Sequence, residues 1–426
     1  MSDIPADHGP EGWAGTVEFA PGPDGFAYRP GEIIVGGEPG RDRAQEMFGG
    51  MFESADLVFP EVDQGLGAGR LYLLRGAVDP IEAVEELRVE GVLAQPNHVM
   101  FAHGDGCGCC GLHPSLRWGG LTGQPMHASP MHASPMHASE LQATGRRRSS
   151  AVPSGPRPRP RLMGQPARVV RVAVLDTGLA AEDLRPRALD SMAPRQQDHW
   201  ERPDPDGDGY LDPAAGHGTF IAGLIDLVTP GCEISVEKVL TSYGEGDEVA
   251  VARRVDALAG GVDLLNLSFG GYAMERMHAL AAAVRRASKL GTVVVASAGN
   301  DATCRPTYPA ALRGVVGVGA IGPHGPAPFT NYGPWVRACA PGVDIVSWFF
   351  TEYDGLDTAS AGAPDPDRFH SWARWSGTSF AAPMVVAALA REMATYGVSA
   401  ADAVGRVIDG ADLLTLPDLG TVVNLS

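Results

Sequence analysis

The chain has 426 residues, of which 44% are hydrophobic and 20% are charged, an ordinary composition for a folded soluble protein. This length allows one large domain together with a smaller one. The formal net charge of −18 argues against nucleic acid as a partner, because an acidic surface repels a polyanion.

The first 25 residues lack the features of a targeting segment. They show no basic stretch followed by an apolar stretch, as a secretory signal would. No segment of the chain has the run of about 18 apolar residues that a membrane span needs. We therefore expect a disordered N-terminus over residues 1–25 and a cytoplasmic protein without a membrane partner, with export by a non-classical route left open.

Residues 26–103 have the pattern of a small α+β domain. GEIIVGG and LYLLRG predict two strands, and GVLAQPNHVMFAH predicts a third. Before the third strand, DPIEAVEELRVEG places apolar residues at helical spacing behind Asp79, a residue type that favours the N-cap position.

Residues 104–166 differ from both neighbouring segments. They contain Cys107, Cys109 and Cys110, three consecutive copies of PMHAS at 125–139, and stretches rich in Pro and Arg. Because this composition lacks the spaced apolar residues that build a core, we interpret the segment as a flexible linker. No second cysteine pair stands at zinc spacing, so free thiols are favoured over a metal site.

Strands and helices alternate in the large domain that we expect over residues 167–426. Strands are predicted in ARVVRVAVLDTG, EISVEKVL, VDLLNLSFGG and TVVVASAGN, with helices in HGTFIAGLIDLV, GDEVAVARRVDALAGG and MERMHALAAAVRRASKLG. This alternation predicts an α/β fold, a parallel sheet with helices on both faces. Catalytic groups in such sheets gather at the carboxyl ends of strands, where Asp176, Ser268 and Asn300 stand.

Four side chains in separate motifs have the chemistry of nucleophilic catalysis. Ser379 in SGTSFAAP stands where a loop becomes a helix, whose N-terminus favours negative charge. His217 in GHGTFIAG is a base able to take the serine proton. Asp176 in VAVLDTG follows an apolar strand, where a carboxylate needs a hydrogen-bond donor such as His217. The amide of Asn300 in ASAGND can donate to a developing oxyanion.

In the order Asp, His, Asn, Ser, these motifs resemble those of the subtilisin-like serine peptidases, the subtilases. The resemblance covers about residues 167–410 and includes LLNLSFGG and YPAAL besides the four motifs above. It implies a subtilisin-like fold, a triad of Asp176, His217 and Ser379, and an oxyanion stabilised by Asn300. It also implies an endopeptidase that works through an acyl-enzyme and requires no cofactor for the chemistry.

The resemblance also indicates where a peptide or protein substrate binds. Subtilases hold the substrate in an extended conformation on an edge strand, through main-chain hydrogen bonds. Residues later in the chain form the pocket that binds the substrate side chain before the scissile bond. The corresponding residues in this chain are Ser268, Phe269, Gly270, Ala298, Gly299 and Thr307.

Two positions depart from the pattern of the family. Thr307 replaces a glycine that is frequent at the floor of the specificity pocket, so we expect a shallower pocket that disfavours large aromatic residues. Phe220 stands where many members have a second histidine after HGT. That histidine is not part of the triad, so the substitution leaves the catalytic prediction intact.

The N-terminal α+β segment resembles, less specifically, the propeptide domains that help subtilases fold and then block the cleft. AQPNHV is similar to the closing strand of those domains. The chain's own N-terminal domain would then be an intramolecular inhibitor, and an unrelated adaptor domain is the alternative. We expect autoprocessing to release it by a cut within about residues 104–168, which Ser379→Ala would prevent.

The segment DPDGDGYLD resembles the first half of a calcium-binding loop. Asp204, Asp206 and Asp208 alternate, and Asp212 closes the run. The glutamate expected at the twelfth position is replaced by Ala215. Structural Ca²⁺ therefore stands beside a second interpretation, an acidic turn that presents the catalytic histidine.

Three other functions fit the same residues. An enzyme with this triad could pass the acyl group to an amine, which would make it a peptide ligase or cyclase, or could be an intracellular peptide-maturation protease. A non-catalytic protein could keep the cleft for peptide binding alone. The product, a free carboxylate or a new amide, separates hydrolysis from ligation, and labelling by a serine-directed phosphonate would exclude the binding protein.

Overall fold

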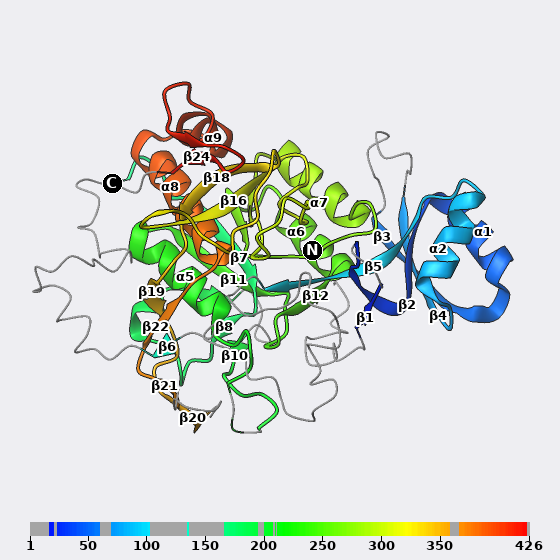
Figure 1. The fold of residues 1–426 in the computed structure, drawn as a ribbon, viewed down its shortest axis with the longest axis horizontal. Coiled ribbons are helices and arrows are strands. Elements are labelled where there is room, and N and C mark those ends of the chain that lie inside the picture. The colour runs from blue at the N-terminus through cyan, green and yellow to red at the C-terminus, as the bar shows by residue number, and fades with distance from the viewer. Residues whose placement is uncertain are drawn as a thin grey trace, which may run out of the picture.

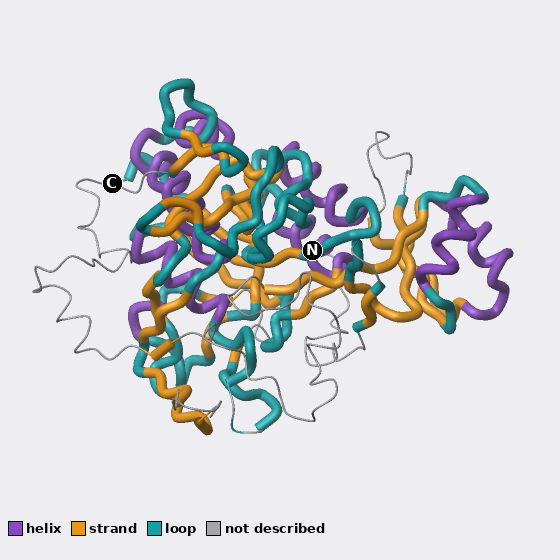
Figure 2. The backbone as a smooth tube through the Cα atoms, in the orientation of Figure 1, coloured by secondary structure: helices purple, strands orange, loops and turns teal. Residues whose placement is uncertain are grey.

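The structure is a computed structural model that describes residues 17–20, 24–59, 70–102, 134–135, 166–194, 200–207, 209, 211–357 and 366–423 (Figures 1 and 2). Within these residues, no helix is long and apolar enough to cross a membrane.

The N-terminal unit, defined here as the described residues from 17 to 102, is an antiparallel sheet with two helices. The predicted strands and helix are present, and the carboxylate of Asp79 caps the helix by accepting from the N–H groups of Ile81 and Glu82. The elements are β1 (Glu18–Phe19), β2 (Ala27–Gly36), α1 (Gly37–Phe48), the 3-10 helix η2 (Gly49–Met51), β3 (Phe52–Phe59), β4 (Leu71–Gly76), α2 (Pro80–Val89) and β5 (Ala94–Ala102).

The two faces of this N-terminal sheet bury different partners. Ile33 and Leu74 pack against helices α1 and α2, in a small core of the unit itself. Ile34 and Leu73 point to the opposite face and belong to a core shared with the rest of the chain. Because side chains alternate along a strand, one sheet holds both cores together.

The C-terminal domain, defined here as the described residues from 166 to 423, follows the predicted alternation. Its elements are β7 (Arg171–Asp176), β8 (Leu179–Ala180), the 3-10 helix η4 (Arg187–Leu189), β9 (Ala193–Pro194), β10 (Trp200–Glu201), α5 (His217–Val228), β11 (Glu233–Lys238), β12 (Glu245–Asp247), α6 (Glu248–Leu258), β13 (Leu264–Leu267), β14 (Phe269–Gly270), α7 (His278–Lys289), β15 (Val293–Ser297), β16 (Val315–Gly322), β17 (Gly325–Pro326), β18 (Val336–Pro341), β19 (Ile345–Trp348), β20 (Tyr353–Asp357), β21 (Pro366–Phe369), β22 (Trp372–Trp375), α8 (Thr378–Tyr396), α9 (Ala400–Val407), β23 (Thr415–Leu416) and β24 (Gly420–Val422).

A largely parallel sheet forms the centre of this domain, in the order β23-β24-β18-β16-β15-β13-β7-β11-β9. Val172 and Val174 of β7 belong to the core that also contains residues of α5 and α8. Ala173 and Leu175 of the same strand belong to the core that contains residues of α6 and α7. Helices therefore cover both faces, as the α/β prediction requires, and Figure 1 shows them on either side of the sheet.

Strand β5 joins the two parts of the molecule. It pairs with β2 of its own sheet and, antiparallel, with both β12 and β14 of the C-terminal domain. In the second pairing Ala102 lies opposite Phe269, and Phe101 lies opposite Gly270. The end of the N-terminal unit thus pairs with the strand that the sequence predicts as the substrate-binding edge.

Three residues of the predicted linker are described, Ser134, Pro135 and Pro166. Ser134 and Pro135 form β6, which pairs antiparallel with β22. The cysteine cluster and the other residues of the 104–165 segment lie outside the described residues.

Candidate active site

Asp176 and His217 meet in the interior at the carboxyl end of the central sheet. Asp176 is the last residue of β7 and His217 the first of α5, and Oδ1 of Asp176 lies 2.7 Å from Nδ1 of His217. Both side chains are fully buried. The helix can begin at His217 because Gly216 takes a φ of 80°, a left-handed conformation that disfavours residues with a Cβ.

This contact determines which nitrogen of His217 is free. Nδ1 faces the carboxylate and donates to it, so Nε2 is the nitrogen that can accept a proton. Nε2 is buried and has no hydrogen-bond partner within the described part of the chain. An imidazole held in this way is prepared to act as a base.

Aromatic side chains surround the imidazole on its other sides. The ring centroids of Trp375 and Phe380 each lie 5.4 Å from that of His217. Phe220, the departure noted above, is fully buried and stacks obliquely on Phe380 at 4.7 Å. Phe220 therefore packs the wall behind the imidazole.

Ser379 lies at the start of α8, next to the predicted substrate strand. Its Oγ donates to the backbone carbonyl of Ser268 at 2.9 Å, and Oγ of Ser268 donates to the carbonyl of Ser379 at 2.8 Å. Ser268 directly precedes β14, so this reciprocal pair fixes the distance between the serine and that strand. Phe380, the next residue, contacts His217, so the fold brings both halves of the predicted triad to one place.

Asn300 is oriented by a residue that the sequence reasoning did not single out as functional. Its side-chain oxygen accepts from both the N–H and the Oγ of Thr378, at 3.0 and 2.9 Å. The hydroxyl of Thr378 in turn accepts from the N–H of Gly299 at 3.0 Å. These contacts fix the orientation of the amide, whose NH₂ group is the part able to donate to an oxyanion. The only sequence signal was the position of Thr378 directly before Ser379.

The predicted specificity-pocket residues gather around a second unforeseen side chain, Asn331. Its amide nitrogen donates to the carbonyl of Ala298 at 3.0 Å and to Oγ1 of Thr307 at 3.1 Å. A Cβ on Gly299 would lie 2.3 Å from the same nitrogen, so glycine is required there. Asn331 is fully buried and thus connects the wall and floor of the predicted pocket.

A buried carboxyl, Glu201, lies behind the Asp176–His217 pair. Burial raises its pKa to about 8, and the negative charge of Asp176 adds a smaller rise. Neither carboxylate oxygen has a partner of good hydrogen-bond geometry within the described residues, although the Thr177 hydroxyl and the Gly216 amide lie near enough to oppose part of this rise. Glu201 therefore holds its proton at neutral pH.

Two aspartates of the predicted calcium loop accept hydrogen bonds, Asp204 from within the loop and Asp206 from outside it. The two oxygens of Asp204 accept from the N–H groups of Gly207 and Gly209, and Asp206 accepts from the hydroxyl of Tyr243. Asp212 is buried nearby, and Asp208 lies outside the described residues. Over the described residues no group of three or more His, Cys, Asp or Glu is placed to hold a metal ion. What the structure describes fits the acidic turn, and calcium stays a prediction.

Buried polar contacts fix β5 beside this site. The carboxylate of Glu248, at the start of α6, accepts from Gln95 at 2.7 Å and from Nδ1 of His98 at 3.0 Å. Its other oxygen accepts from the N–H groups of Ala279 and Leu280 in the first turn of α7. Glu248, Gln95 and His98 are all essentially inaccessible to solvent. One carboxylate thus ties the N-terminal unit to two helices of the C-terminal domain.

Comparisons with known proteins show the family of this chain. Residues 167–408 match the model of the subtilase family. The chain is 32% identical over 233 residues to subtilisin Savinase of Lederbergia lenta, covering 52% of this chain and 75% of that protein. It is 31% identical over 212 residues to subtilisin DY of Bacillus licheniformis, covering 45% and 72%. For the thermostable alkaline protease of Halalkalibacterium halodurans the identity is 32% over 207 residues, which cover 46% of this chain and 54% of that protein.

Among solved structures, a cold-adapted subtilisin-like serine proteinase is similar with a TM-score of 0.46 and 25% identity, over 60% of this chain and 89% of that one. The family model covers more than half of the chain, and the named relatives are proteases. The roles of the individual residues stay predictions. The family match over residues 167–408 shows that the chain belongs to the subtilases, a family of serine peptidases.

Proposed function

We propose that this subtilase is an endopeptidase in which Ser379 is the nucleophile, His217 the general base and Asn300 the oxyanion donor. The observation that carries the proposal is the buried 2.7 Å contact between Asp176 and Nδ1 of His217. It leaves Nε2 as a proton acceptor at the start of α5, beside the helix that presents Ser379. This is the arrangement that activates a serine hydroxyl.

The reaction would proceed in two steps. Oγ of Ser379 turns from the Ser268 carbonyl to Nε2 of His217, loses its proton there and bonds to the substrate carbonyl carbon. The carbonyl oxygen becomes an oxyanion that accepts from the amide of Asn300, and the leaving amine takes the proton back from His217. Water then attacks the acyl-enzyme by the same path and releases a free carboxylate.

A serine-directed fluorophosphonate tests this proposal. The wild-type chain should be labelled at Ser379, and both Ser379→Ala and His217→Ala should abolish labelling while circular dichroism stays native. Labelling that survives in Ser379→Ala, or none in the wild type after release of the N-terminal unit, would contradict it.

We also propose that the N-terminal unit inhibits the enzyme and is released by the enzyme itself. Three features support this: β5 pairs with the substrate strand β14, its side chains are bound by Glu248, and Ser379 is fully buried. In this pairing Ala102 lies opposite Phe269, the residue after Ser268, and the carbonyl of Ser268 accepts from Oγ of Ser379. The cut would therefore fall close to His103, at the start of the predicted linker.

Intact mass over time tests the self-cleavage. The wild type should lose a fragment that ends near residue 103, and Ser379→Ala should stay whole. If the mutant is cut at the same bond with the same rate, another protease makes the cut and the proposal is wrong.

Two expectations stay predictions beside this function, a cytoplasmic location and a structural calcium ion. If Asp208 completes a site with Asp204 and Asp206, Ca²⁺ should raise the melting temperature by several degrees over a chelator control. Asp208→Asn should remove that increase. Equal melting temperatures with calcium and with chelator would leave the acidic turn as the explanation of the loop.

A further inference from the structure

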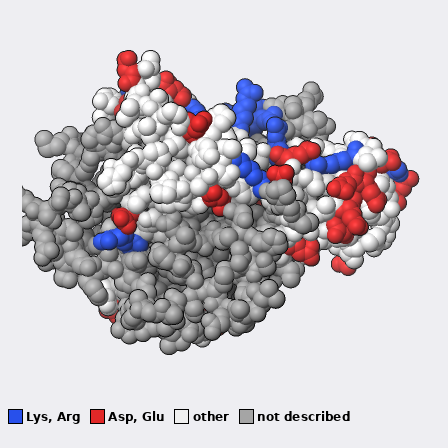
Figure 3. All heavy atoms as spheres, viewed as in Figure 1, with Lys and Arg blue, Asp and Glu red and all other residues white. Residues whose placement is uncertain are grey.

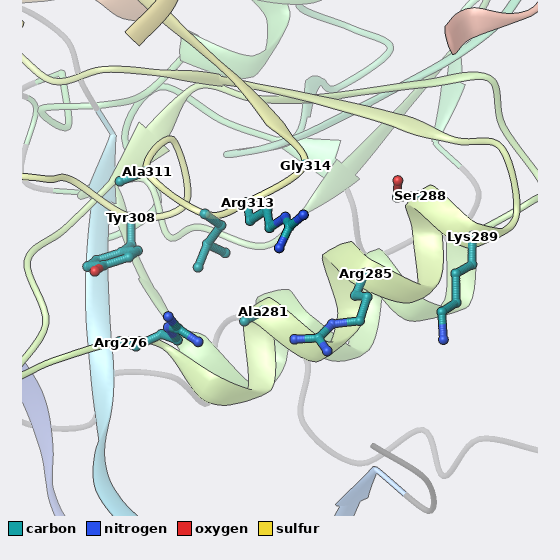
Figure 4. A pocket seen from close by; sticks show the side chains of 10 residues that line it. Arg276, Ala281, Arg285, Ser288, Lys289, Tyr308, Ala311, Arg313 and Gly314 are labelled. Carbon is teal, nitrogen blue, oxygen red and sulfur yellow. The ribbon is translucent and has the colours of Figure 1, made fainter. Parts of the chain in front are cut away.

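A cavity of about 650 Å³ lies on the surface of the C-terminal domain, between α7 and the segment 308–314. Figure 4 shows basic side chains around it, with Arg313 from the segment on one side and Arg276 and Arg285 from α7 and its preceding loop on the other. The lining residues are Arg276, Ala281, Arg285, Ser288, Lys289, Tyr308, Ala311, Leu312, Arg313 and Gly314.

The charge of this cavity is not balanced. Three of its lining residues are arginines, and no Asp or Glu lines it. Arg276, Arg285 and Arg313 form no ion pair within the described residues, whereas the neighbouring Arg286 pairs with Asp256 at 2.9 Å. In a chain with a net charge of −18, such a concentration of unpaired cations marks a site for an anion. Figure 3 shows Lys and Arg gathered over the region of α6 and α7, and Asp and Glu over the N-terminal unit.

The cavity lies beside the path of the chain that approaches the catalytic serine. Tyr308, one of its lining residues, pairs through two 2.9 Å backbone hydrogen bonds with Gly271, which directly follows β14. At the other end, the side chain of Gln95 in β5 accepts from the N–H of His278, two residues beyond Arg276. If a substrate took the place of β5, the residue in the position of Gln95 would lie near the cavity. That residue is seven positions before the one in the position of Ala102.

We propose that this cavity is an exosite for an acidic segment of the substrate, located upstream of the scissile bond. The inference rests on the proposed endopeptidase function and names its substrate class. Carboxylates of Asp or Glu side chains would bind the guanidinium groups of Arg276, Arg285 and Arg313, which are suited to bidentate contacts.

A peptide anion fits better than other anions because of the place of the cavity. Main-chain pairing at β14 binds any extended peptide, so it supplies little sequence preference. A charged surface a few residues upstream adds selectivity and speeds encounter with acidic substrates. The cavity is open on the surface of the intact chain, so it can be probed before the N-terminal unit leaves.

Direct binding tests the exosite without requiring activity. The full-length Ser379→Ala chain is titrated with a fluorescein-labelled hexaglutamate peptide and with the matching hexaglutamine peptide, followed by anisotropy. We expect the glutamate peptide to bind, the glutamine peptide to bind at least about tenfold more weakly, and about 0.5 M NaCl to remove the difference. Arg276→Gln, Arg285→Gln and Arg313→Gln combined should abolish binding, while Arg187→Gln, at an exposed arginine of η4, should not.

Three results would overturn the exosite. The first is equal binding of the two peptides, and the second is binding by the triple variant that is as tight as binding by its parent. The third is displacement of labelled hexaglutamate by inorganic phosphate that is as effective, per unit of charge, as displacement by the unlabelled peptide. The last result would mean a general anion site.

Cleavage gives the second readout. For peptides that differ only in an acidic or an amide-containing upstream segment, the wild type should show a higher kcat/KM for the acidic one, mainly through KM. In the triple variant the ratio should fall close to one. If neither peptide is cut and Ser379 is not labelled by phosphonate, the endopeptidase proposal has failed; if both are cut at equal rates by the wild type, the exosite alone is wrong.

Discussion

Ser379 and Asn300 each form hydrogen bonds that fix the side chain, Ser379 with Ser268 and Asn300 with Thr378. The two sets of hydrogen bonds have different consequences for the proposed reaction. The contact of Ser379 with the Ser268 carbonyl must break before the hydroxyl can meet Nε2 of His217. The contacts of Asn300 with Thr378 can persist through the reaction, because they involve the oxygen of the amide and not its nitrogen. Thr378 is thus a positioning residue for the predicted oxyanion donor.

Replacing Thr378 by Val tests this positioning. The side chain keeps its size but loses the hydroxyl that donates to Asn300 and accepts from Gly299. We expect kcat to fall about ten- to a hundredfold with little change in KM, because the lost orientation acts in the transition state. Steady-state kinetics on a short peptide checks it, and a rise in KM at constant kcat would speak for a role in substrate binding instead.

Thr307→Gly tests the predicted shape of the specificity pocket. Removing the side chain would deepen the pocket and free the amide of Asn331 that now donates to Thr307. Relative to alanine, phenylalanine before the cut should gain at least about tenfold in kcat/KM. A peptide library read by mass spectrometry measures this, and a wild type that already prefers Phe or Tyr would refute the shallow pocket.

Glu201→Gln tests the buried acid behind the triad. A carboxyl whose pKa is raised from 4.5 to about 8 supports folding fully below about pH 4.5 and loses that contribution as the pH rises through 8. Gln cannot ionise, so the variant should match the wild type at low pH and exceed it by a few kcal/mol above pH 8. Chemical denaturation across this range measures the difference. The exposed Glu182→Gln is the control, and parallel curves for Glu201→Gln and the wild type would contradict the raised pKa.

At the scale of elements, β5 is the strand through which the proposed inhibition would act. Nε2 of His98 accepts from the N–H of Met274 at 3.2 Å, so its Nδ1 carries the proton that it donates to Glu248. One neutral imidazole therefore bridges a loop and the start of α6. Without it, the carboxylate and the amide would both lose a buried partner, a loss of about 1–3 kcal/mol for each group.

His98→Ala in the Ser379→Ala chain tests this bridge. Hydrogen exchange at the amides of β5 should become at least about tenfold faster, because the strand opens more readily from β12 and β14. Exchange in the central strands β13 and β15 should stay unchanged. The exposed His324→Ala is the matched control, and equal exchange in β5 for both variants would remove His98 from this role.

At the scale of the whole molecule, the sequence predicts the individual helices and strands better than the tertiary contacts between them. Motifs at strand ends indicated Asp176 and Asn300, and motifs at helix starts indicated His217 and Ser379, because each combines a reactive side chain with a recognisable local turn. Helix α1 was not foreseen, because GEPGRDRAQEMF contains glycine, proline and charged residues in place of a regular apolar stripe.

Long-range contacts account for the other omissions. Asn331 and Glu248 act through partners far away in the sequence, and a lone Asn or Glu carries no signal of that. The cationic cavity is similar, since Arg276 and Arg313 come from separate segments that only the folded chain brings together. Periodicity reports which face of an element is buried, but not which other element buries it.

Because β5 lies between β12 and β14, the proposed cut would change inhibition from an intramolecular to a bimolecular equilibrium. Before the cut, the strand is part of the same chain, so its effective concentration at the cleft does not depend on how dilute the protein is. After a cut near residue 103, the N-terminal unit is a separate molecule whose occupancy follows mass action. Dilution alone would then activate the processed enzyme, and a higher concentration of enzyme and released N-terminal unit would inhibit it.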